Sequence, residues 1–295
     1  MDDAILSAKS PLLHHGGRRG HRRGLKGPDS AVYLSALRPM PPNRHILSFA
    51  EYAAIRHPTP YVVDLARGDA RLVVFGGRHS SDPADPMCEQ IDAAFAALAP
   101  AFALHEGTPP AVELDREIAI RRHGEAGLVR RLAARAGIET ASMDIPLPDE
   151  ARLLGRELSR SEALVYLVVR QLASFNRKTA RMDYDGYFSD FFALIGPPLG
   201  LAVDWPLVER EHARVLGRPL APRTVTARET DPMRDELPTQ RIARLSNRLR
   251  DEHMLDRLLA ALAAHPRVFA TVGVSHAVML EPALRAALAP PNAGT

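Results

Sequence analysis

Two histidines far apart in the chain, His79 and His276, stand in the same local sequence and could do chemistry together. Each one ends a Gly-x-x-His tetrapeptide, which begins at Gly76 in the first case and at Gly273 in the second. Each tetrapeptide follows a short apolar run, and such a run closed by glycine predicts a buried strand that enters a turn. Ligands bind outside the carboxyl ends of the strands in open α/β sheets. The repetition therefore predicts a site built from both imidazoles, whereas one tetrapeptide alone would be an ordinary turn with a surface histidine.

A carboxylate and a charged helix segment supply further candidate groups. Glu106 follows the apolar run 101–104 and precedes a glycine, so it is also expected at a strand end. There it could orient an imidazole, bind a metal or act as a general base, and its alternative is a solvated loop residue or a helix cap. In a long predicted helix, the segment 246–254 places serine and asparagine ahead of Arg250 and Asp251. Serine and asparagine are mildly unfavourable inside helices, so this segment points to more than a solvated charged face.

Together these groups could hydrolyse an ester or an amide. His79 would act as the general base that takes a proton from water, and Glu106 would orient and polarise it. His276 would be a second proton carrier or a metal ligand. Arg250 would stabilise the oxyanion that forms when the carbonyl is attacked. Asp251 would hold Arg250 or a histidine in place.

Two other routes use the same region of the chain. The sequence has no Gly-x-Ser-x-Gly turn, which favours attack by water, but Ser80 and Ser275 lie beside the histidines and keep a serine nucleophile open. His79, Glu106 and His276 could equally form a three-ligand site for a divalent metal with one open position. The helical His-Glu-x-x-His motif of many zinc enzymes is absent from the sequence.

A binding protein is the alternative from another functional class. Haem or another planar ligand could be held between the histidines of the two tetrapeptides. The aromatic residues that could line such a pocket are Tyr166, Tyr184, Tyr187 and Phe188. Aromatic residues at these spacings more often belong to a hydrophobic core.

The motifs resemble those of a known superfamily, which includes the erythromycin esterases, the haem-binding ChaN proteins and the TraB/Tiki-type proteins. Its members share two Gly-x-x-His motifs at strand ends, a glutamate after the second strand and an Arg-Asp-x-x-Met helix before the last strand. Here the helix motif runs from Arg250 to Met254, and the resemblance spans about residues 60–290. The stretch 79–107 is most similar to uncharacterised bacterial members that carry a His-x-x-Asp-Pro loop after the first motif.

The resemblance implies a parallel-sheet α/β fold in which the two Gly-x-x-His loops face one another. It implies ester hydrolysis as in the erythromycin esterases, peptide hydrolysis with a divalent metal as in the Tiki proteins, or haem binding as in the ChaN-like proteins. One departure is that Gly76 is followed by another glycine, where many Tiki members have threonine or serine. Arg78 also adds a charge near the predicted site.

The predicted elements place these residues in an α/β fold, a mostly parallel central sheet flanked by helices with a helical insertion at about 149–238. The first two strands are expected to form a hairpin, and the second and third, joined by a helix, should be parallel neighbours. Residues 196–238 carry many prolines and few periodic apolar positions, which predicts an irregular segment, such as a lid over the site. Strands are expected at 61–65, 71–75, 101–105, 138–143 and 267–272, and helices at 85–98, 126–136, 149–155, 160–176, 239–264 and from Glu281 onward.

Composition indicates a globular protein. The 295 residues can bury a sizeable core, and 46% apolar with 25% charged residues is ordinary for this class. We expect a single α/β domain over 46–295 after a disordered basic tail over 1–45, because the tail is rich in glycine and arginine without apolar periodicity. The excess of basic residues falls within 1–30, so nucleic acid is not an expected partner of the folded body. The expected partner is a small-molecule or peptide substrate.

Cysteine content and hydropathy limit the kinds of site and the cellular location that we expect for the protein. Cys88 is the only cysteine, which excludes intramolecular disulfides and a cysteine-based zinc site, and we expect a buried, inert thiol. The longest apolar stretch, 93–104, is interrupted by Pro100 and is too short to span a membrane. No secretory signal opens the chain, so we expect a cytoplasmic location.

Overall fold

The structure, a computed structural model, describes residues 45–107, 111–177 and 183–289. Within these ranges five strands form one sheet in the order β1-β2-β5-β3-β4. The strands are β1 (Tyr61–Arg67), β2 (Ala70–Gly77), β3 (Phe102–His105), β4 (Glu139–Ser142) and β5 (Arg267–Gly273). β1 runs antiparallel to β2 and the other neighbouring pairs are parallel, so the predicted α/β class with a mostly parallel sheet is confirmed. The tail predicted over 1–45 lies outside the described residues, apart from residue 45.

The strand order differs from the prediction in one respect. β1 and β2 form the expected hairpin, which turns at Gly68, where a φ of 56° suits glycine. β2 and β3 are not neighbours, because β5 lies between them and pairs in parallel with both. Every residue of β5 from Val268 to Gly273 is buried, and a central strand covered on both faces needs apolar side chains on both sides. The carboxyl ends of the four parallel strands still meet at one edge of the sheet.

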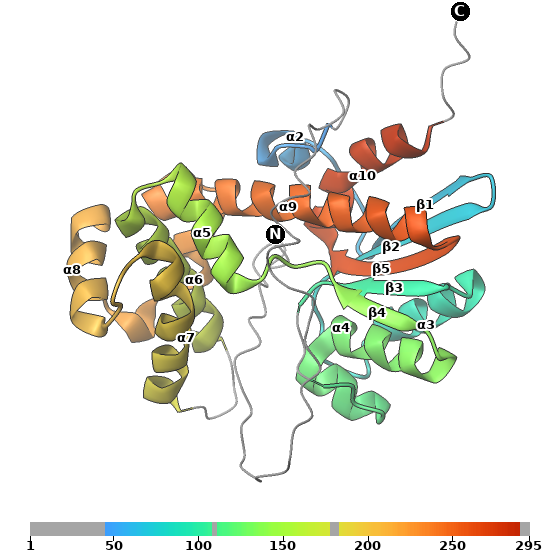
Figure 1. The fold of residues 1–295 in the computed structure, drawn as a ribbon, viewed down its shortest axis with the longest axis horizontal. Coiled ribbons are helices and arrows are strands. Elements are labelled where there is room, and N and C mark those ends of the chain that lie inside the picture. Colours follow the sequence, from blue (N-terminus) through green and yellow to red (C-terminus); the bar gives the residue numbers. More distant parts are fainter. Residues whose placement is uncertain (1–44, 108–110, 178–182, 290–295) are drawn as a thin grey trace, which may run out of the picture.

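Helices cover both faces of the sheet (Figure 1). α3 (Pro86–Leu98) and α4 (Arg116–Ala136) pack on one face, and α9 (Pro238–Ala264) and α10 (Val274–Leu288) pack on the other. The short helix α2 (Phe49–Ala53) packs against α10. Alternate strand residues point to opposite layers, so Phe75 joins the α3–α4 layer while Val74 joins the α9–α10 layer. In the part of the chain that the structure describes, no helix is long and apolar enough to cross a membrane.

α10 begins at Val274, directly after β5, and not at Glu281 as predicted. Pro282 lies inside this helix rather than at its start. Burial of residues such as Ala277 and Leu280 against the sheet outweighs the backbone hydrogen bond that the proline removes. The histidine of the second Gly-x-x-His motif therefore lies in the first turn of a helix and not in a loop.

α4 begins earlier than the predicted helix 126–136 and is broken at Gly124. The φ of 58° and ψ of −142° at this glycine are not helical. The break separates two helical halves, and Glu125 opens the second of them. Gly124, which precedes the predicted helix, thus marks a change of direction within the observed one.

Beside the sheet lies a helical lobe, residues 147–177 and 183–245, which corresponds to the predicted insertion (Figure 1). Its elements are α5 (Leu147–Glu157), α6 (Arg160–Asn176), α7 (Tyr184–Leu199), α8 (Trp205–Leu216), the 3-10 turns η2 (Pro222–Thr224) and η3 (Ala227–Thr230), and the first part of α9. The prediction of an irregular lid over 196–238 is wrong for α8, which packs against α6 within the lobe. Asp204 caps α8, Pro206 lies in its first turn, where proline is tolerated, and Gly217 ends it.

The aromatic residues considered for a planar ligand belong to the core of the helical lobe. Tyr166, Tyr187 and Phe188 are buried there, and Tyr184 stacks on Trp205. The core interpretation of these residues is confirmed.

α9 links the lobe to the sheet, and Figure 1 shows it running from one to the other. Near its start Ile242 is buried in the core of the lobe, and further along Met254 and Leu258 are buried against the sheet. The charged segment 246–254 is therefore the part of α9 that connects the two hydrophobic cores.

Candidate active site

The carboxyl ends of the four parallel strands bring polar residues to one place. His79 follows β2, Glu106 follows β3, Asp144 follows β4 and His276 follows β5. Arg250 of α9 reaches the same place and donates hydrogen bonds to Glu106 and Asp144. The structure thus brings together the four residues considered catalytic. It adds Asp144, which was not among the predicted site residues although its position at the end of a predicted strand was a usable signal.

Glu106 lies at the centre of this cluster, with 7% of its side chain exposed. Its Oε1 accepts a hydrogen bond from Arg250 Nη2 at 2.9 Å, and its Oε2 accepts one from the backbone N–H of Gly273 at 2.7 Å. The Nε2 atoms of His79 and His276 face the same carboxylate at 3.6 and 3.9 Å. Burial alone would raise the pKa of Glu106, but the charges of the two histidines and of Arg250 hold that pKa well below its usual range. Glu106 is therefore an anion at neutral pH.

His276 is held by a second carboxylate. Its Nδ1 donates a hydrogen bond to Asp251 Oδ1 at 2.5 Å, and both side chains are buried. Burial alone would lower the pKa of His276, but the adjacent Asp251 carboxylate and Glu106 raise the pKa above its usual value. Asp251 thus holds a histidine, which is one of the two roles predicted for it, and His276 favours the protonated state.

His79 is flanked by a carboxylate on each ring nitrogen. It lies in the loop after β2 with a φ of 60°, a left-handed conformation that residues other than glycine rarely adopt. Its Nδ1 lies 3.4 Å from Glu125 Oε2, on the side of the ring opposite Glu106. Glu125 also accepts a hydrogen bond from the backbone N–H of Ser80 at 3.3 Å. The sequence analysis missed Glu125, which follows an arginine-rich helical stretch, and the glycine before it was the one local signal.

Glycines of the two motifs make room for these groups at the strand ends. A Cβ on Gly273 would lie 2.5 Å from His79 Nε2, and a Cβ on Gly77 would lie 2.5 Å from Glu125 Oε1. Gly76 faces the opposite layer, where a Cβ would lie 2.6 Å from a side chain of α10. The glycine requirement is therefore steric, because each missing side chain leaves space for an acid–base group or for the helix that carries one.

Arg250 is buried, and two carboxylates share its guanidinium. Nη2 donates to Glu106 Oε1 at 2.9 Å and to Asp144 Oδ1 at 2.7 Å. Asp144 Oδ2 also accepts a hydrogen bond from the backbone N–H of Gly107 at 2.6 Å, which ties the ends of β3 and β4 together. Burial alone would lower the pKa of Arg250, but Asp144 and Glu106 raise it well above its usual value. Nε and Nη1 donate to none of the described residues, which leaves them for a further acceptor.

Two residues of the motifs lie at the margin of this cluster. Arg78 pairs through two hydrogen bonds, of 2.5 and 3.0 Å, with Asp85, the residue that caps α3. Its charge is therefore balanced by a helix cap, and about half of its side chain is exposed. Ser275 is buried in the first turn of α10, beside His276.

The three residues considered as metal ligands, His79, Glu106 and His276, do not fit a metal ion in this arrangement. Within the described ranges, no group of three or more His, Cys, Asp or Glu side chains is arranged to hold one. Arg250 Nη2 lies 2.9 Å from Glu106 Oε1 and supplies a positive charge at the oxygen that a cation would need. The other oxygen accepts a backbone hydrogen bond.

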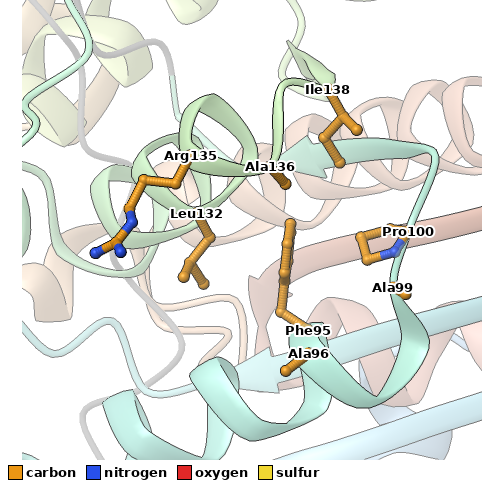
Figure 2. Close-up of a pocket in the computed structure, with 8 residues that line it drawn as sticks. All are labelled: Phe95, Ala96, Ala99, Pro100, Leu132, Arg135, Ala136 and Ile138. Atoms are coloured by element: carbon orange, nitrogen blue, oxygen red, sulfur yellow. The ribbon is translucent and has the colours of Figure 1, made fainter.

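A separate pocket of about 470 Å³ lies away from the site (Figure 2). It opens at the amino ends of β3 and β4, whereas the histidines lie past the carboxyl ends of the strands. Its lining residues are Phe95, Ala96, Ala99, Pro100, Leu132, Arg135, Ala136 and Ile138. The lining is apolar except for Arg135, so the pocket contributes no acid–base group.

Cys88 and His105 are buried outside the cluster. Burial raises the pKa of the Cys88 thiol to about 11, in agreement with the prediction of a buried, inert thiol. His105 ends β3, directly before Glu106, and its burial lowers its pKa to about 4. Its Nδ1 has no hydrogen-bond partner among the described residues, and burial favours the neutral form of the ring.

No protein-family model, curated protein or solved structure matches this chain. The resemblance to the erythromycin esterase, ChaN and TraB/Tiki superfamily therefore depends on the motif residues alone. Any functional conclusion has to come from the geometry of the cluster at the strand ends.

Proposed function

We propose that this protein is a hydrolase that activates water for attack on an ester or an amide, and that it belongs to the superfamily its motifs resemble. The observation that carries the proposal is the shared carboxylate. The Nε2 atoms of His79 and His276 face Glu106 at 3.6 and 3.9 Å, while each Nδ1 faces a carboxylate of its own. Two oriented imidazoles around one anion are suited to moving protons to and from a reacting group.

His79 is the general base in this proposal. Its Nε2 faces Glu106, so a water molecule that contacts both groups can give its proton to the imidazole while the carboxylate orients it. Glu125 orients the ring through Nδ1, in the role that carboxylates play behind catalytic histidines. Glu106 is an anion and shares that orienting role, as the sequence analysis proposed.

His276 and Arg250 assist the later part of the reaction. The water oxygen bonds to the carbonyl carbon, and Arg250 stabilises the oxyanion through donors that Glu106 and Asp144 leave unused. His276, whose protonated form the Asp251 carboxylate favours, gives its proton to the leaving oxygen or nitrogen as the bond to carbon breaks. A proton transfer from His79 to His276 then resets the pair.

The substrate class is a small molecule or a peptide with an ester or amide bond. The test is a panel of fluorogenic esters and amides incubated with the wild type, His79→Ala and Glu106→Gln. The control is His45→Ala, which alters an exposed histidine paired with Glu51 outside the site. Hydrolysis that persists in His45→Ala and is lost in both site variants supports the proposal. Equal hydrolysis in the wild type and His79→Ala contradicts it.

Incubation of the same proteins with haemin tests the ligand-binding alternative. A Soret band with the wild type that disappears in His79→Ala, together with no hydrolysis of any substrate in the panel, would favour the ligand-binding alternative. That result would assign the two imidazoles to a ligand and not to proton transfer.

A further inference from the structure

The serine of the charged α9 segment has a partner in the helical lobe. Ser246 Oγ donates a hydrogen bond to Glu150 Oε1 of α5 at 2.6 Å, and both residues are buried. The neighbouring Asn247 bonds only locally, to the carbonyl oxygen of Ala243 at 2.8 Å. The helix-unfavourable serine is thus explained by a contact between α9 and α5.

Glu150 is held from a third helix as well. Arg170 of α6 donates to both of its carboxylate oxygens, at 2.5 and 2.7 Å, and to Ser246 Oγ at 3.3 Å. The Glu150 side chain is 5% exposed and that of Arg170 is 13% exposed. A two-pronged pair of this kind fixes the carboxylate in position as well as neutralising it.

The Glu150 carboxylate lies on the side of α9 toward which Arg250 extends. Ser246 and Arg250 are four residues apart on one helix, so their side chains share a face, and helical side chains lean toward the N-terminus. At its far end the Arg250 guanidinium meets Glu106 and Asp144. Attraction to Arg250 also contributes to the lowered pKa of Glu150.

Buried charges of opposite sign therefore surround Arg250. Asp144 and Glu106 accept hydrogen bonds from its guanidinium, and Glu150, which is paired with Arg170, attracts it from a greater distance. Asp144 and Glu150 come from one short stretch of chain, the end of β4 and the start of α5. This stretch therefore supplies two of the carboxylates whose charges act on the guanidinium.

We propose that Glu150, held by Arg170 and Ser246, is a positioning residue for Arg250, so that the helical lobe sets where the oxyanion-stabilising guanidinium lies. The inference rests on the proposed function only for the role of Arg250. The competing explanation is a purely structural ion pair that joins α5, α6 and α9. The two differ in what happens to Arg250 when Glu150 and Arg170 are removed together.

The experiment measures hydrogen exchange of the Arg250 Nε–H group by NMR, with its signal identified by its loss in Arg250→Lys. The variants are Glu150→Gln and the double variant Glu150→Gln/Arg170→Met. The single variant leaves Arg170 buried without a partner and is expected to be destabilised, whereas the double variant removes both charges and should recover much of the stability. The matched control is Asp149→Asn, which removes the adjacent carboxylate of α5, paired with Arg152 and partly exposed.

The expected result is Arg250 Nε–H exchange about tenfold faster in the double variant than in the wild type, with thermal stability close to that of the wild type and no change in Asp149→Asn. Wild-type exchange in the double variant would overturn the proposal and leave a structural pair. An equal acceleration in Asp149→Asn would overturn it too, because the effect would then follow from loosening α5. This readout needs no substrate, so its failure is distinct from a failure to detect hydrolysis.

Discussion

His276 and His79 face the same carboxylate, but the structure holds their rings in different ways. His276 lies in the first turn of α10, and its Nδ1 is 2.5 Å from a buried Asp251 oxygen. His79 lies in a loop with left-handed backbone, and its nearest carboxylate oxygens, from Glu125 and Glu106, are 3.4 and 3.6 Å away. The first ring is held by a short charge-assisted bond, whereas the carboxylates that flank the second ring lie at longer distances.

This difference suits two different tasks. A general acid has to keep its proton until the leaving group departs, and the short bond to Asp251 favours the protonated state of His276. A general base has to accept a proton from a water molecule, and the longer carboxylate distances at His79 suit that task because neither carboxylate forms a short bond to the ring. One repeated motif thus supplies two unlike histidines, because the carboxylate behind each ring comes from a different helix.

The largest effects are expected on turnover, when His79 or the carboxylate that it shares with His276 is replaced. His79→Ala and Glu106→Gln should each reduce turnover of a substrate found in the panel by about two orders of magnitude or more. Because they act as a unit, the double variant should be little worse than the poorer single variant. Steady-state kinetics of the three proteins checks this, and losses that multiply in the double variant would contradict the shared role.

His105 is a third buried histidine near the strand ends, and no carboxylate of the described residues forms an ion pair with it. Its pKa of about 4 lies below its ordinary value near 6.5, so its neutral form contributes stability above pH 6.5 that is lost as the pH falls toward 4. In the wild type this contribution amounts to about 3 kcal/mol of unfolding free energy. Urea unfolding of the wild type and His105→Phe at pH 7.5 and 4 measures it.

The variant His105→Phe should lose less stability than the wild type over that interval, whatever its stability at pH 7.5. The His276 contribution has the opposite sign, since a raised pKa gives stability below pH 6.5 that is lost as the pH rises through the pKa in the folded protein. Because His276 is present in both proteins, it cancels in the difference. Identical pH profiles would show that His105 is not a buried neutral group.

The variant Asp251→Asn tests whether the Asp251 carboxylate raises the pKa of His276. Loss of the carboxylate should lower the pKa of His276 by at least about one unit, a tenfold change in its proton affinity. Burial lowers this pKa, and the Asp251 charge that mainly opposes burial would be gone. NMR titration of the imidazole resonances measures the shift. The control is Glu125→Gln, which alters the carboxylate behind His79 and should leave the His276 titration within about half a unit. An equal shift in both variants would mean that the two histidines titrate as one coupled group.

The smallest effect is expected for Arg78→Ala, inside the first motif but at the margin of the site. The Arg78 guanidinium pairs with the helix-capping Asp85 and about half of the side chain is exposed, so its removal should cost no more than about 1 kcal/mol of unfolding free energy. Turnover should stay within about twofold of the wild type. Thermal unfolding and kinetics check both values. A loss of rate as large as that of His79→Ala would place Arg78 in contact with substrate.

Much of the fold was predictable because its signals are local. Short apolar runs closed by glycine located β2 and β5, and the hairpin turn joined β1 to β2. Periodic apolar positions located α3, α6 and α9. The errors fell where packing opposed a local signal: Pro282 did not start α10, because burial against the sheet carries the helix through it, and the prolines near α8 did not prevent a helix.

Local sequence signals were enough to place residue types at the strand ends, since His79, Glu106 and His276 each follow a recognisable strand signal. Which of these groups pair depends on the tertiary fold. Asp251 reaches His276 from α9, Glu125 reaches His79 after a break in α4, and Arg250 lies between the sheet and the helical lobe. The physical reason is that strand and turn signals depend on a few adjacent residues, whereas each of these contacts joins elements distant in the chain. Their geometry depends on the strand order, with β5 at the centre, and on helix packing that no local pattern encodes.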